Sequence, residues 1–165
     1  MYNKLLTQVI LFSSISMAEV LYVPAEFLTI QDAIEASESG DSVLVSPGLY
    51  QENINFEGNP ITVSSLYLIG GDSLLIGTTI IDGQQNGSVV TFASGEDSGS
   101  ILQGFTLQHG SGNDEDPDEN GSYYTYGGGI YCENSDPTIR DCIIRDNVAN
   151  EGGGGGIFCY ESSPT

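Results

Sequence analysis

The fold is decided by the segment Gly128-Gly129-Ile130-Tyr131-Cys132, which recurs 27 residues later as Gly155-Gly156-Ile157-Phe158-Cys159. Self-similarity at a fixed period of this size is typical of repeat proteins, in which each copy is one structural unit that stacks on the next. We therefore expect a solenoid in which equivalent inward residues stack, Ile130 on Ile157 and Cys132 on Cys159.

Two further matches extend the repeat. Ser135–Thr138 recurs at the same offset as Ser162–Thr165, and Leu102–Leu107 has the apolar pattern of Ile139–Ile144. The second pair is 37 residues apart, because the polar stretch 111–126 is inserted between its copies. The last copy stops before its equivalent of Ile139, so we expect the chain to be truncated at the C-terminus.

The rest of the chain contains short apolar segments with period-2 character, separated by Gly, Asn, Asp and Pro. Strands this short cannot form a β-sandwich with a 27-residue repeat. A coil of three such strands accounts for that repeat. Each coil would pair in parallel with the next, about 4.8 Å away. The predicted strands are 43–45, 54–56, 61–63, 66–69, 79–81 and 89–92.

One helix is predicted over 29–37. Ile30, Ala33 and Ile34 fall on one face, Thr29 can cap the first turn, and Gly40 is expected to stop it. The first coil of a solenoid has an uncovered apolar end, so this helix is expected to cap it.

The stretch 27–54 resembles the opening of the pectin-lyase-like right-handed parallel β-helix superfamily, and of pectinesterases in particular. The resemblance rests on a capping helix and a strand, followed by Pro47-Gly48, Tyr50 and Glu52-Asn53-Ile54. Ile80-Ile81-Asp82-Gly83 fits the same pattern, and the Gly-rich repeats resemble those of bacterial surface β-helix proteins. The resemblance implies an all-β, right-handed parallel β-helix over 19–165 with a short N-terminal capping helix.

Residues 1–18 are predicted to be a secretory signal peptide. Lys4 supplies the positive start, 5–15 is mostly apolar, and Ser16-Met17-Ala18 offers a cleavage site. The alternative is an ordinary buried N-terminal strand. A signal peptide implies a secreted or cell-surface protein. No other apolar stretch is long enough to span a membrane, so we expect no membrane span in the mature chain.

The charge of the chain excludes two classes of partner. Three Lys and Arg residues against 23 Asp and Glu residues give a formal net charge of −20. Such a surface repels a phosphate backbone and anionic lipid headgroups, so no nucleic-acid partner is expected.

The insertion holds a candidate Ca²⁺ site at Asp114, Asp116, Asp118 and Asn120. From Asp116 onwards, the spacing matches the first positions of an EF-hand loop, but its twelfth position would be Gly127 instead of Glu. The alternative is a solvated acidic loop without metal.

Three tyrosines that follow the acidic residues form the candidate binding site: Tyr123, Tyr124 and Tyr126. Exposed aromatic rings beside polar groups hold sugars by stacking on their apolar faces. The alternative is that these rings pack the loop onto the solenoid wall.

Other polar residues are predicted to be structural. Arg140 and Arg145 are expected to point outward in surface ion pairs, Asn147 to lie in an internal ladder, and His109 in a turn. All three cysteines are expected to be small inward residues: Cys132, Cys142 and Cys159. Export would permit a disulfide between Cys132 and Cys159, which is kept as an alternative.

The sequence contains no complete catalytic motif. The first interpretation is therefore an exported β-helix protein that binds a polysaccharide or a cell-surface component through loops on its wall. The alternative is a polysaccharide-processing enzyme, pectate-lyase-like or pectinesterase-like, whose catalytic coils lie beyond Thr165.

Overall fold

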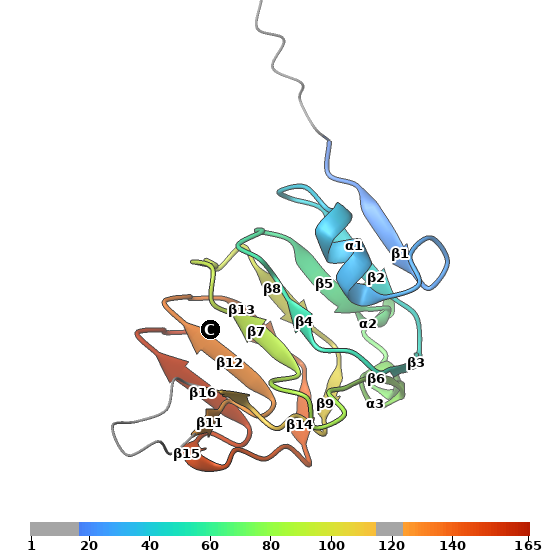
Figure 1. Ribbon diagram of the computed structural model, residues 1–165. Helices are drawn as coiled ribbons and strands as arrows, with labels where there is room; N and C mark the ends of the chain where they lie inside the picture. Colours follow the sequence, from blue (N-terminus) through green and yellow to red (C-terminus); the bar gives the residue numbers. More distant parts are fainter. Residues whose placement is uncertain (1–16, 115–123) are drawn as a thin grey trace, which may run out of the picture.

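The computed structural model describes residues 17–114 and 124–165 (Figure 1). Most of its regular structure consists of short strands in three parallel sheets, which confirms the all-β prediction. Sheet A has the strand order β1 (Val20–Val23), β2 (Ser42–Val45), β5 (Thr62–Ser65), β8 (Ile101–Gln103), β13 (Thr138–Arg140). Sheet B has the order β3 (Gly48–Tyr50), β6 (Thr79–Asp82), β9 (Thr106–Gln108), β14 (Ile143–Arg145). Sheet C has the order β4 (Ile54–Asn55), β7 (Val90–Phe92), β12 (Ile130–Glu133), β16 (Ile157–Tyr160).

The chain enters the three sheets in a fixed order. It runs through β2, β3 and β4, then through β5, β6 and β7, and each new strand pairs in parallel with the strand laid down one turn earlier. Figure 1 shows these turns following one another from the blue end of the chain to the red end. A small sheet D, made of β10 (Asn113–Asp114), β11 (Thr125–Tyr126) and β15 (Glu151–Gly153), flanks the last turns.

The registers of the strands confirm the stacking predicted from the repeat. Ile130 pairs with Ile157 and Cys132 pairs with Cys159 on β12 and β16. In sheet A, Val43, Val63 and Leu102 form one column of fully buried side chains. Because side chains alternate along a strand, residues paired in register on successive strands face the same side of the sheet. The three sheets thus share one apolar core.

The predicted helix is present as α1 (Ile30–Ala36), and Thr29 is its N-cap, accepting a hydrogen bond from the Asp32 N–H at 3.0 Å. Its three predicted apolar residues are fully buried and belong to the core. The helix ends at Ala36 with Ser37 as its C-cap, close to the predicted end, whereas Gly40, expected to stop it, lies in the next turn with φ +94°. Two further N–H groups of the first turn, those of Ile30 and Gln31, are satisfied by the carboxylate of Glu52.

The strand predicted over 66–69 is wrong. The chain forms two short helices there, α2 (Tyr67–Gly70) and α3 (Leu74–Thr78), and neither buries a residue. Ile69 and Leu74 are 70% and 74% exposed, so apolar composition here does not indicate a core strand. Gly71 ends α2 in the left-handed region at φ +67°, and this breaks the extended pattern. No helix of the described residues is long and apolar enough to cross a membrane.

Candidate functional site

An aromatic band lies on the outer face of sheet C. Ile130 and Cys132 are fully buried, so the intervening Tyr131 and the following Glu133 point away from the core. On β16, Phe158 pairs with Tyr131 and Tyr160 pairs with Glu133, which extends the same face. The repeat therefore places equivalent side chains next to one another outside the sheet as well as inside it.

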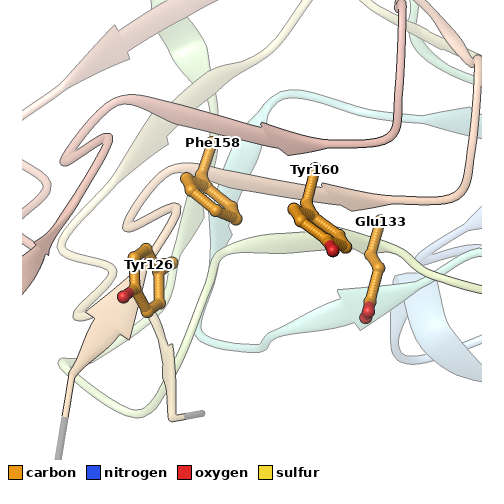
Figure 2. A pocket seen from close by; sticks show the side chains of 4 residues that line it. All are labelled: Tyr126, Glu133, Phe158 and Tyr160. Atoms are coloured by element: carbon orange, nitrogen blue, oxygen red, sulfur yellow. The ribbon is translucent and has the colours of Figure 1, made fainter.

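Four side chains of this region line a hollow of about 360 Å³: Tyr126, Glu133, Phe158 and Tyr160. Figure 2 shows them on one side of the strand pair, with Phe158 next to Tyr126 and Tyr160 next to Glu133. Tyr160 is 53% exposed, so its ring is open to a ligand. The volume is within the range of small-molecule sites in proteins.

The aromatic rings of the band pack against one another. The centroid of Phe158 lies 4.6 Å from that of Tyr126 and 5.7 Å from that of Tyr131. The Tyr131 hydroxyl donates a hydrogen bond to Glu133 Oε2 at 3.2 Å. This contact holds the carboxylate of Glu133 at the edge of the hollow. The site thus combines apolar ring faces with one fixed acceptor group.

The position of Tyr126 depends on the backbone around it. β11 pairs with β15 in parallel and with β10 in antiparallel fashion. Gly127 then turns the chain into β12 with φ +65°, and a Cβ at this position would lie 2.5 Å from the Ile130 carbonyl oxygen. Only glycine fits this turn, which carries the Tyr126 ring to the Phe158 ring.

The predicted binding tyrosines have different outcomes. Tyr126 lines the hollow, Tyr124 is half-buried and is not among the lining residues, and Tyr123 lies outside the described residues. The sequence did not single out Phe158, Tyr160 or Glu133. The alternation along β12 and β16, which puts the Ile and Cys residues on one face and these side chains on the other, is the signal that could have found them.

The candidate Ca²⁺ site is not described by the structure. Asp116, Asp118 and Asn120 lie outside the described residues, and for Asp114 only the backbone, in β10, is described. Within 17–114 and 124–165, no group of three or more His, Cys, Asp or Glu side chains is arranged to hold a metal. Calcium binding by the insertion stays a prediction.

A second polar cluster lies on sheet B, where Asp82, Gln108 and Arg145 are in register on β6, β9 and β14. Gln108 Nε2 donates to Asp82 Oδ2 at 2.9 Å, and Arg145 Nη2 donates to Gln108 Oε1 at 2.8 Å. His109 Nδ1 lies 2.8 Å from the same Asp82 oxygen. Burial acts to raise the pKa of Asp82, but the hydrogen bonds from Gln108, His109 and the Gln84 N–H outweigh it and lower that pKa.

The residues predicted to be structural have mixed outcomes: among the described residues, neither an ion pair of Arg140 nor a ladder of stacked Asn side chains at Asn147 is found. His109 follows β9 in a turn with φ +56°, and Asn147 bonds to the backbone of Leu107 and Gly110. Arg145 is exposed and lies 3.9 Å from Asp146, whereas Arg140 donates to Gln103.

The three cysteines are free thiols. Cys132 is buried and Cys142 is partly buried, as expected for small inward residues. Cys159 is exposed, so the prediction that it is a buried residue is wrong. The reason is that β16 is the last strand in the order of sheet C, so no further described strand covers it.

No protein-family model, no curated protein and no solved structure matches this chain.

Proposed function

We propose that this protein is an exported right-handed parallel β-helix that binds carbohydrate through the outer wall of its solenoid. The regular passage through sheets A, B and C supports the solenoid. Crossovers between parallel strands of one sheet are right-handed in nearly all proteins, which supports the hand.

Export is supported by the predicted signal peptide and by the position of the first strand. β1 begins at Val20, two residues after the predicted cleavage point at Ala18. Removal of 1–18 would therefore leave every described strand whole.

The observation that carries the binding function is the aromatic hollow on sheet C. A pyranose ring presents apolar C–H faces, which stack on aromatic rings, and hydroxyl groups, which donate to carboxylates. Tyr160 and Phe158 supply the rings, and Glu133 supplies an acceptor already oriented by Tyr131. An open hollow with this chemistry suits a polymer that passes across the wall.

A pull-down with insoluble polysaccharides tests the proposal. The wild-type protein, Tyr160→Ala and Phe158→Ala are compared, with Tyr22→Ala as matched control, because Tyr22 is a 43% exposed tyrosine on β1 of sheet A. We expect the two hollow variants to lose about two- to tenfold in affinity and the control to bind like wild type, since an aromatic stacking contact contributes about 0.5–1.5 kcal/mol. Thermal melting of each variant verifies that it folds. Equal retention of all four folded proteins would refute a sugar site in the hollow.

A polysaccharide-processing enzyme is the second candidate, and the Asp82–His109 pair is the observation that favours it. A carboxylate on Nδ1 orients an imidazole so that Nε2 faces outward as a base, and the side chain of His109 is 46% exposed. His109→Gln should then abolish any cleavage of polysaccharides by the protein. Cleavage at an unchanged rate would rule out this pair.

A further inference from the structure

We infer that the hollow on sheet C selects positively charged amino sugars, that is, hexosamines with a free ammonium group, over neutral and acidic sugars. The inference rests on the proposed carbohydrate-binding function and names its ligand class. Three features of the hollow carry it: its charge, its aromatic lining and the way its carboxylate is held.

The charge of the lining is negative. Glu133 is the charged side chain among the four lining residues, and the remaining three are aromatic. The two arginines of the described chain lie elsewhere, on β13 and β14, where their guanidinium groups bond to glutamine side chains. A formal net charge of −20 for the chain adds a field of the same sign. An acidic sugar is repelled from such a site and a cationic sugar is attracted.

The aromatic lining favours a cation as well. An ammonium group over the face of a tyrosine or phenylalanine ring, within about 6 Å of its centroid, is attracted by the ring quadrupole. Figure 2 shows the Tyr160 ring between Phe158 and the Glu133 carboxylate. An ammonium paired with Glu133 therefore also meets the ring of Tyr160. Rings around a cation with a carboxylate at one side form the cage by which proteins bind organic ammonium groups.

The carboxylate is held for such a contact. Tyr131 donates to Oε2 of Glu133, and Tyr131 is itself covered by Phe158 and only 6% exposed. The donor thus fixes Glu133 from the protein side, and Oε1 can accept an ammonium N–H without reorganisation. Ordering of the side chain is a main cost of surface ion pairs, and this contact reduces that cost.

Calorimetric titration with three oligosaccharides tests the inference. The probes are a glucosamine oligomer, the same oligomer fully N-acetylated, and a galacturonate oligomer, all at pH 6 and physiological salt. We expect the glucosamine oligomer to bind about tenfold more tightly than its acetylated form, from the combined cation–π and charge contacts. We expect no measurable binding of the galacturonate oligomer.

Two glutamate variants separate the site from general attraction to an acidic protein. Glu133→Gln should reduce the preference for the free amine from about tenfold to about two- or threefold, the part due to the rings and to the overall charge, while binding of the acetylated oligomer is kept. Glu57→Gln is the matched control: it removes the same charge from an exposed residue after β4, at the other end of sheet C, and should keep the tenfold preference.

The outcomes distinguish the two proposals. Equal affinity for both hexosamine oligomers, lost in Tyr160→Ala, would overturn the charge selection and leave the carbohydrate site standing. Equal loss of preference in Glu133→Gln and Glu57→Gln would also overturn it, because the attraction would then be nonspecific. Absence of binding to every oligomer and every insoluble polysaccharide would refute the proposed function itself.

Discussion

Replacing Gly129 by alanine tests why glycine recurs at equivalent positions of the repeat. A Cβ at this position would lie 2.5 Å from the Gly156 carbonyl oxygen, 2.7 Å from Ile144 Cγ2 and 2.9 Å from Asn147 Nδ2. The Gly156 carbonyl accepts the Ile130 N–H at 2.8 Å, so its displacement also weakens a bond between successive coils. Overpacking costs about 1–3 kcal/mol and a lost backbone hydrogen bond about 1 kcal/mol, so we expect a loss of about 2–4 kcal/mol.

Thermal unfolding followed by circular dichroism measures this loss. For a domain of this size, 1 kcal/mol corresponds to about 2–4 °C, so the melting temperature of Gly129→Ala should fall by roughly 4–16 °C. Gly77→Ala is the matched control, because a Cβ on Gly77 in α3 meets nothing within 4 Å, and alanine favours the helix. The control should melt at or slightly above the wild-type temperature. A Gly129→Ala protein that melts with the control would refute the close stacking of coils at the repeated glycines.

Three further predictions follow from the described contacts. Phe92→Ala removes a fully buried ring from the core and should cost about 3–5 kcal/mol, measured by denaturant unfolding; a loss under 1 kcal/mol would contradict the packing. The pKa of Asp82 is lowered below its ordinary value of 3.8, so its contribution to stability is present above pH 4 and is lost as the pH falls through its folded-state pKa. The difference in melting temperature between wild type and Asp82→Asn should therefore be present at pH 6 and shrink towards pH 3; a constant difference would argue against the shift. Burial, followed by the neighbouring Cys159, raises the pKa of Cys132 to about 12, so a thiol reagent at pH 8 should label the exposed Cys159 first, and equal labelling rates would contradict this environment.

The sequence predicted those parts of the fold that depend on local pattern and on the repeat. Equal positions of a repeat stack, so the offset of 27 residues was sufficient to place Ile130 beside Ile157. The helix followed from the spacing of three apolar residues after Thr29. Both signals can be read directly from the sequence, the first as its self-similarity and the second within one short window.

The parts that sequence reasoning missed depend on contacts between distant residues. Glu52 caps α1 from 22 residues away, and no pattern within the helix reveals it. The segment 66–69 is apolar but lies outside the core, and only the tertiary arrangement shows that it has nothing to pack into as a strand.

The candidate site was predicted only in part, because it too depends on contacts between distant residues. Tyr126 was singled out as an aromatic residue beside a polar loop, and it does line the hollow. Phe158, Tyr160 and Glu133 were passed over, because the alternation of their strands was used only to find inward residues. The hollow itself arises where sheet D brings Tyr126 against sheet C, which is a contact that no short window of sequence contains.

Nuclear magnetic resonance of the aromatic side chains during titration with the glucosamine oligomer tests the central claim most directly. Because the chain has nine Tyr, six Phe and no Trp residues, the aromatic spectrum is small enough to assign. We predict that the ring signals of Tyr126, Phe158 and Tyr160 shift together with one saturation curve, while the ring of Tyr22 on sheet A does not shift. Saturable shifts confined to rings outside the hollow, or no shift of any ring up to millimolar oligomer, would contradict a sugar-binding wall on sheet C.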